Sequence, residues 1–180
     1  MMTIAVRILL FLLLLSPVTV QANYNDAEIK AAFLVNFGRF VQWPEASTPR
    51  TAQELRIGIM GRDPFGPALA SFATQTVSGV PIRFLPVSTM KEASSCHILY
   101  LSPSLRRRAA RILRGLEGKP VLTVSDMKGF LEMGGCIELM TIDRHIRFAV
   151  NLKTCQQQHL HPSAHLLELA RYVVMPKEEP

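Results

Sequence analysis

Apolar and polar residues alternate with two different periods along this chain, and the change of period separates the expected helices from the expected strands. Near the amino end, apolar residues recur at the spacing of an amphipathic helix, at Ile29, Phe33, Phe37, Phe40 and Val41. A capping box over Asn25 to Glu28 predicts where this helix starts, and the Trp43-Pro44 step predicts its end at about Gln42. Arg39 lies about 100° from Phe40 around this helix, so we expect its stem to pack and its guanidinium to reach water.

Short β runs and helices alternate after a polar linker over Glu45 to Glu54. The β runs are LRIGIMG, VPIRFLPV, CHILYLS and KPVLTVS. The helical segments between them are RDPFGPALASFA, STMKEA with Ser88 as its cap, and SPSLRRRAARILRGL with Ser102 or Ser104 as its cap. This alternation is typical of parallel β-α-β units with helices on both faces of a sheet.

The last third of the chain has a different pattern of secondary structure. The runs GGCIELMTID and HIRFAVNL are separated by a tight turn at Asp143-Arg144, which predicts an antiparallel hairpin. Asn151 is placed to cap a helical LKTCQQQH, and a final helix PSAHLLELARYVV would hold Pro162 in its first turn. We therefore predict an α/β fold: one domain over 23–175, with a mixed, mostly parallel sheet of about six strands, flanking helices and a C-terminal antiparallel hairpin. A polar tail covers 176–180.

The first 22 residues match a secretory signal peptide. Arg7 supplies the charge, Ile8 to Leu15 form an apolar run too short to span a membrane, and Val20-Gln21-Ala22 resembles a cleavage site. The chain would then start at Asn23 and act outside the cytosol, with its formal net charge of +6 reduced to +5 by loss of Arg7. Lipid headgroups, cell-wall polymer or an acidic protein surface are the expected partners, rather than nucleic acid.

Three cysteines allow at most one internal disulfide. If Ile142 pairs with His145 across the turn, Cys136 lies opposite Asn151 and Cys155 follows one turn later, which brings the two thiols into bridging range. A slip of one residue would redirect either side chain, so a Cys136–Cys155 bridge and its absence both stay open. Cys96, at the start of a central strand, is interpreted as a small buried side chain.

No motif predicts catalysis, a metal or a cofactor. The glycines of GIMGRDPFG fit neither the dinucleotide fingerprint nor the P-loop and are interpreted as turn residues. His161 and His165 have zinc-ligand spacing, with His159 nearby, but Pro162 interrupts them and Cys155 is the one further ligand close in sequence. Neither His97 nor Ser125-Asp126 belongs to a recognisable nucleophile, base and orienting group.

Arginines gather on one predicted helix. Arg107, Arg111 and Arg114 form a row opposite an apolar stripe of Leu105, Ala109, Ile112 and Leu116. Such a row is either an ordinary solvated face or a docking surface for an acidic partner or a phosphate-bearing membrane.

Four stretches in order resemble the YfiR-like periplasmic family: KAAFLVNFGRFVQWP, SCHILYLS, LTVSDMKGF, and GGCIELMTIDRHIRFAVNL with a later LLELAR. The resemblance implies a small exported α/β domain without catalysis, acting as a repressor that binds the periplasmic part of a membrane-bound diguanylate cyclase or a similar sensor protein. It also implies an outer-membrane lipoprotein that can sequester the repressor, and a homodimer. Within the family motifs, the positions carried over as candidate contacts are Arg39, Trp43, Arg147 and Asn151.

Two positions depart from the family pattern. Relatives can carry a cysteine in the first strand facing the cysteine of SCH, where this chain has Gly58, and some pair the Cys136 position with a cysteine at Gly129. The family's redox-sensitive bridging is therefore not expected intact. The alternative function is a periplasmic small-molecule-binding accessory domain of a sensor or transport system, with a pocket near Gly61 to Phe65 and Ser125 to Phe130. A hydrolase would need a nucleophile that the sequence does not display.

Overall fold

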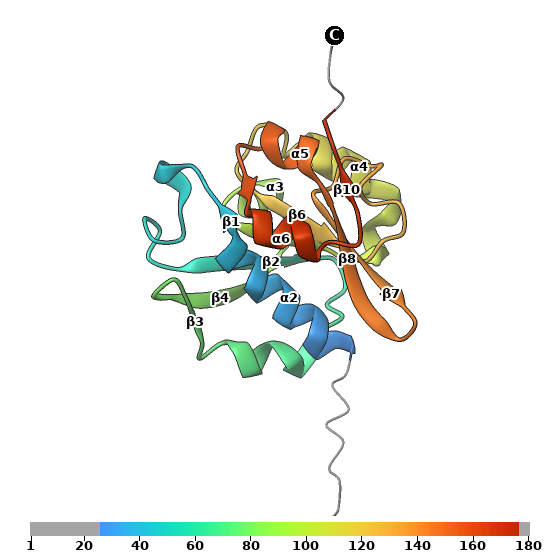
Figure 1. Ribbon diagram of the computed structural model, residues 1–180. Coiled ribbons are helices and arrows are strands. Elements are labelled where there is room, and N and C mark those ends of the chain that lie inside the picture. The colour runs from blue at the N-terminus through green and yellow to red at the C-terminus, as the bar shows by residue number, and fades with distance from the viewer. Residues whose placement is uncertain (1–25, 177–180) are drawn as a thin grey trace, which may run out of the picture.

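A twisted central sheet organises the computed structural model, which describes residues 26–176 (Figure 1). Its eight strands lie in the order β10-β8-β7-β6-β5-β2-β4-β3, and a separate pair, β1-β9, lies beside it. The elements are α2 (Asp26–Phe40), β1 (Val41–Gln42), η2 (Glu45–Ser47), β2 (Leu55–Met60), η3 (Gly66–Phe72), β3 (Thr76–Val77), β4 (Val80–Val87), α3 (Met90–Ala93), β5 (Ile98–Leu101), η4 (Pro103–Leu105), α4 (Arg106–Arg114), β6 (Leu122–Ser125), β7 (Ile137–Ile142), β8 (His145–Asn151), α5 (Leu152–Gln157), β9 (His161–Pro162), α6 (Ala164–Leu169) and β10 (Val173–Val174).

The predicted fold class is confirmed. Strands β4, β2, β5, β6 and β7 are parallel neighbours, and β7 and β8 form the antiparallel hairpin. The expected count of about six corresponds to the six longer strands. The two-residue strands β3 and β10 extend the sheet to eight, and two residues are too few to show a period of two.

Hydrophobic layers cover both faces of the sheet. On one face α2 packs against a cluster that includes Ile57, Tyr100 and Val124, and the rings of Phe37 and Phe148 meet edge to face at 5.3 Å. On the other face Ala109 of α4 belongs to a second cluster with residues of β2, β4 and β5. These two layers bury both faces of the sheet. The ends of the sheet and the outer faces of the helices therefore remain accessible to a partner or ligand.

Two helices are shorter than the sequence pattern predicts. Helix α2 ends at Phe40, because Val41 leaves it to pair with Pro162 in the β1-β9 ladder. The pattern extends the final helix to residue 174, but α6 ends at Leu169, and the β-branched Val173 and Val174 pair with β8 instead. Pro162 is thus a strand residue, and Ser163 caps α6 through the Leu166 amide.

The caps also differ in part from expectation. Thr89, and not Ser88, caps α3, because its hydroxyl accepts from the Glu92 amide while the Glu92 carboxylate accepts in return from the Thr89 amide. Ser102 caps only the 3₁₀ turn η4, and α4 begins later, at Arg106. The predicted cap at Asn25 lies outside the described residues. The segment predicted as a helix at RDPFGPALASFA contains the 3₁₀ helix η3.

The hairpin register is the one predicted. Ile142 pairs with His145, and Asp143 and Arg144 have φ values of 47° and 62°, as a two-residue primed turn requires. The Asn151 amide donates to the Cys136 carbonyl at 2.8 Å, so these two residues lie opposite one another. The expected cap is also present, because Asn151 Oδ1 accepts from the Thr154 amide at 3.0 Å. The hairpin therefore places Cys136 opposite Asn151, as predicted, and Cys155 lies in the helix that Asn151 caps.

Candidate functional site

The three arginines of the predicted row lie exposed on α4. Ala109 and Ile112 bury the opposite side of this helix, which turns Arg107, Arg111 and Arg114 outwards. None of the three forms an ion pair with a carboxylate in the described part of the chain. We call these three residues the arginine face. It is a stripe of positive charge without an internal counter-charge.

The end of α2 forms a second candidate surface. Arg39 is exposed, and its guanidinium donates to Asn36 Oδ1 at 3.3 Å. Trp43 is buried, with its indole Nε1 unpaired among the described groups and its ring edge to face with His97 at 6.0 Å between centroids. A groove of about 420 Å³ is lined by Arg39, Trp43 and Arg50 among others, and we call it the α2 groove.

The remaining two candidate contacts differ in accessibility. Arg147 is exposed on β8, between the buried Ile146 and Phe148. Asn151 is buried, and besides its cap on α5 it donates through Nδ2 to the Leu131 carbonyl at 3.2 Å. Both polar ends of the Asn151 side chain therefore serve the fold.

A cavity of about 430 Å³ opens near the carboxyl end of β6. On its wall Lys30 Nζ lies 2.6 Å from Asp126 Oδ2, and the Tyr100 hydroxyl donates to the same carboxylate. Burial, then this hydrogen bond, raises the pKa of Tyr100 far above its ordinary value. Asp126 is thus engaged by two partners from the protein itself. Of the pocket predicted from the sequence, the half at Ser125 to Phe130 contributes here, whereas Gly61 to Phe65 do not line this cavity.

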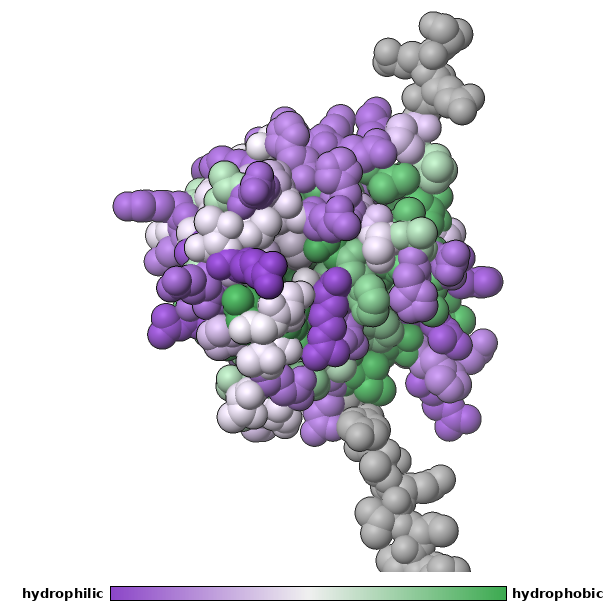
Figure 2. Space-filling view, turned by 60° about the vertical axis from the view of Figure 1, so that its left-hand side comes forward, coloured by the Kyte–Doolittle hydropathy of each residue, from purple (hydrophilic) through white to green (hydrophobic). Residues whose placement is uncertain are grey.

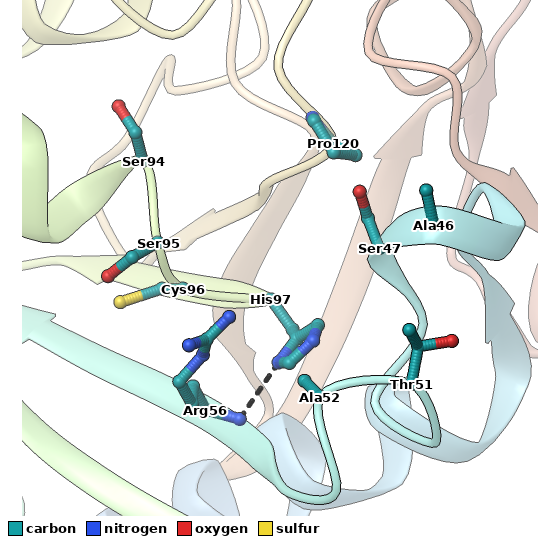
Figure 3. A pocket seen from close by; sticks show the side chains of 10 residues that line it. All are labelled: Ala46, Ser47, Thr51, Ala52, Arg56, Ser94, Ser95, Cys96, His97 and Pro120. Carbon is teal, nitrogen blue, oxygen red and sulfur yellow. Dashed lines mark hydrogen bonds between the residues drawn. The ribbon is translucent and has the colours of Figure 1, made fainter.

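At the opposite end of the sheet, where β2 and β5 begin, a cavity of about 320 Å³ contains Arg56 and His97 (Figure 3). The Arg56 amide donates to His97 Nδ1 at 3.0 Å, and the His97 amide donates to the Arg56 carbonyl at 2.9 Å. Burial, then the charge of Arg56, lowers the pKa of His97 to about 4, while a hydrogen bond to the Thr48 backbone opposes this shift. His97 is therefore neutral at pH 7 and ties the segment after Trp43 to the sheet. We call this cavity the amino-edge cavity.

Sequence reasoning missed the amino-edge cavity. The available signals were a single arginine in the apolar run LRIGIM and a histidine at the start of HILYL. Each is by itself common at a strand end, and the two are 41 positions apart in the chain.

The cysteines are three buried free thiols. Cys136 Sγ donates to Gln158 Oε1 at 3.0 Å, and a hydrogen bond with Cys136, together with burial, raises the pKa of Cys155 far above its ordinary value. A Cys136–Cys155 bridge stays a prediction. At the other thiol, a β-carbon built on Gly58 would lie 2.6 Å from Cys96 Sγ, so Gly58 does face Cys96 as the family resemblance implied.

Within residues 26–176, no three histidine, cysteine or acidic side chains gather closely enough to hold a metal ion. His159 and His161 are exposed, and the ring of His165 packs beside Phe40. In the same range no helix has both the length and the apolar character needed to cross a membrane.

Exposed hydrophobic side chains gather towards the carboxyl end. Figure 2 shows a mostly polar surface in which hydrophobic side chains collect on one side of the view. The large hydrophobic residues with the greatest exposure are Leu169, Tyr172, Val174 and Met175. Exposed apolar side chains that gather in one segment are typical of interaction sites.

Comparison with known proteins identifies the family of the chain. A model of the YfiR/HmsC-like family matches residues 27–171. The chain belongs to this family. The family is one of periplasmic regulators, which confirms the resemblance in the sequence motifs. Among curated proteins none matches the chain.

A solved structure of the ABC domain in complex with L-Trp from Streptococcus pneumonia is similar in fold. It is 13% identical with a TM-score of 0.50, over 79% of this chain and 61% of that one. The chain thus spans less than two thirds of that protein's length, and at this identity the likeness concerns the fold alone.

Proposed function

We propose that this protein is an exported, non-catalytic repressor, which binds the periplasmic part of an inner-membrane diguanylate cyclase or a similar sensor and lowers cyclic-di-GMP signalling. The family match over residues 27–171 supports a regulatory role. The observation that carries the docking mechanism is the arginine face, whose three guanidinium groups have no carboxylate partner among the described residues.

The arginine face has the geometry of a docking stripe. Residues 107, 111 and 114 are four and three positions apart, so their side chains lie along one side of α4. A guanidinium offers a planar fork of donors to a carboxylate and gives up its water more readily than an ammonium. The partner surface is therefore acidic, and attraction over a distance increases the association rate at low salt.

In this scheme the repressor also binds partners other than the cyclase. An outer-membrane lipoprotein that sequesters the repressor would release the cyclase. The exposed apolar residues from Leu169 to Met175 would provide a surface for that lipoprotein or for a second copy of the chain. The α2 groove, with Arg39 at its rim and Trp43 in its wall, is a second surface for the cyclase or sensor.

The test is a quantitative pull-down from detergent-solubilised inner membrane of the native host, with the mature chain as bait under reducing and under oxidising conditions. The bait is compared with the triple variant Arg107→Gln, Arg111→Gln, Arg114→Gln. A matched control removes the same charge from the exposed Arg62, Arg83 and Arg144.

We expect the unmodified chain and the control to recover a membrane cyclase or sensor, and the arginine-face variant to recover about tenfold less or lower still. Failure of the unmodified chain to recover any such protein in either redox state would contradict the proposed function. Equal recovery by the arginine-face variant would contradict this docking surface.

A further inference from the structure

The amino-edge cavity contains a positive charge that the protein itself does not neutralise. The Nε atom of Arg56 is buried without a hydrogen-bond partner among the described residues, and its guanidinium forms no ion pair with a carboxylate in that range. Figure 3 shows the guanidinium lying between Cys96 and His97. A partly buried cation is costly when it lacks a partner, so this arrangement favours an external anion.

The wall of the amino-edge cavity contains no negative charge, although the Glu92 carboxylate lies near enough to Cys96 to raise the pKa of that thiol. The cavity wall has no carboxylate, and its two other titratable side chains, Cys96 and His97, are both neutral near pH 7. Burial raises the pKa of the Cys96 thiol to about 11, and burial also keeps His97 unprotonated by lowering its pKa. An anion that enters would therefore meet the guanidinium before any carboxylate, because Glu92 does not line the cavity.

A second cation and several hydroxyl groups complete the cavity. Lys119 Nζ donates to Ser94 Oγ at 2.8 Å, which brings an ammonium group to the rim. Ser94, Ser95 and Ser47 line the cavity. The Ser94 and Ser95 hydroxyls donate to the Met90 and Glu92 carbonyls at 2.7 Å, which leaves their oxygens as acceptors. An oxygen that accepts is suited to the hydroxyl donors of a sugar or polyol.

We propose that the amino-edge cavity is a binding site for a small hydroxylated anion, a polyol or sugar with one carboxylate or phosphate group. The anionic group lies on the Arg56 fork with Lys119 nearby, and the polyol lies against the serine hydroxyls. A volume of about 320 Å³ matches a ligand of this size. Binding is a property of the isolated chain and does not depend on any partner.

Trp43 provides the readout. It is the one tryptophan of the sequence, and its ring meets His97, which lines the cavity. A ligand against His97 is expected to change the Trp43 environment and hence its fluorescence. Trp43 also lines the α2 groove, so the same residue lies between the two cavities.

The experiment titrates the purified mature chain, in a phosphate-free buffer at constant ionic strength, with inorganic phosphate, glycerol 3-phosphate and gluconate in separate arms, and with glycerol and sodium chloride as neutral and salt controls. Trp43 fluorescence and the melting temperature are recorded. Arg56→Gln removes the proposed anion ligand. Arg83→Gln is the matched control, because Arg83 is the register neighbour of Arg56 on β4 and does not line the cavity. Ala46→Phe fills the cavity mouth at an exposed position and leaves Arg56 in place.

Glycerol 3-phosphate or gluconate should raise the melting temperature with concentration and shift the fluorescence, in the unmodified chain and in Arg83→Gln alike. Affinity should fall about tenfold or more in Arg56→Gln and in Ala46→Phe. Response to the phosphates alone or to gluconate alone identifies the anionic group. The proposal is overturned if neither glycerol 3-phosphate nor gluconate binds, if inorganic phosphate alone binds, if glycerol binds equally well, or if Ala46→Phe binds like the unmodified chain. Should Arg56→Gln not fold, Ala46→Phe decides the result.

Discussion

Replacing Gly58 by cysteine tests the placement of β2 against the start of β5. A β-carbon at this position would lie 2.6 Å from Cys96 Sγ and 2.7 Å from Val87 Cγ2. The first distance places the introduced β-carbon directly beside the Cys96 sulfur, as a disulfide requires, and the second means that the reduced side chain is crowded. We therefore expect Gly58→Cys to lower stability when reduced, by about 1–3 kcal/mol, as overpacking typically does.

Oxidation should reverse this loss. A bridge between the introduced thiol and Cys96 would close a loop of about 40 residues, which stabilises the fold by about 4 kcal/mol in the chain-entropy description. For a domain of this size that corresponds to a melting temperature roughly 8–16 °C above that of the reduced variant.

The assay is differential scanning fluorimetry of Gly58→Cys, with and without a reductant, next to the double variant Gly58→Cys, Cys96→Ser. The double variant keeps the crowding but cannot bridge, so its melting temperature should not respond to the reductant. The assigned contact would be refuted by two results together. The single variant would have the same melting temperature with and without the reductant, and its mass after oxidation would show that the introduced thiol and Cys96 are both free.

Buried polar groups and thiols give three further predictions. Asn151→Ala should lower the free energy of unfolding by about 1–3 kcal/mol in a urea titration, because it removes the cap on α5 and the bond to the Leu131 carbonyl. As a control, the half-buried Asn36, whose side chain accepts a 3.3 Å hydrogen bond from the exposed Arg39, is replaced by alanine, which should change the free energy of unfolding by less than about 0.5 kcal/mol. The pKa of His97 is about 4 in the folded chain, against 6.5 for an ordinary histidine, so the unfolded chain binds more protons between these values and stability falls as pH falls from 6.5 to 4. His97 contributes about 3 kcal/mol to this loss, and the slope should be shallower in His97→Gln; parallel slopes would contradict the assignment. With oxidised glutathione as the acceptor of two electrons, Cys136 and Cys155 should lose their protons and form one disulfide. A non-reduced digest should then contain the two linked peptides. If both thiols are instead alkylated after the oxidised chain is unfolded, the predicted disulfide is contradicted.

The sequence predicts those parts of the fold that depend on local pattern. The six longer strands are recognisable because runs such as VPIRFLPV and CHILYLS have strong β propensity and clear boundaries. The hairpin register follows from the turn at Asp143-Arg144, since the turn fixes which residues face each other.

The remaining parts depend on tertiary contacts that no local pattern displays. Val41 leaves α2 only because Pro162, over a hundred positions later, pairs with it. The end of α6 is set in the same way by the pairing of Val173 with β8. Helical periodicity continues through both segments, so periodicity alone extends the helices too far.

The candidate sites also differ in how far the sequence alone predicts them. The arginine face was predictable, because three arginines at helical spacing identify a face without reference to the rest of the fold. The amino-edge cavity was not, because it requires β2 and β5 to be neighbours before Arg56 and His97 can meet. Burial of Trp43 against His97 also depends on that pairing.

The central claim, that the protein lowers cyclic-di-GMP by binding a membrane partner through the arginine face, is tested most directly in cells. The nucleotide is quantified by mass spectrometry after deletion of the gene and after complementation with the unmodified chain, with the Arg107→Gln, Arg111→Gln, Arg114→Gln variant, or with the Arg62, Arg83 and Arg144 control. The account predicts that deletion raises the cyclic-di-GMP level, and that the unmodified chain and the control restore it while the arginine-face variant does not. A level that is unchanged by deletion, or restored equally by all three chains at equal abundance, would contradict it.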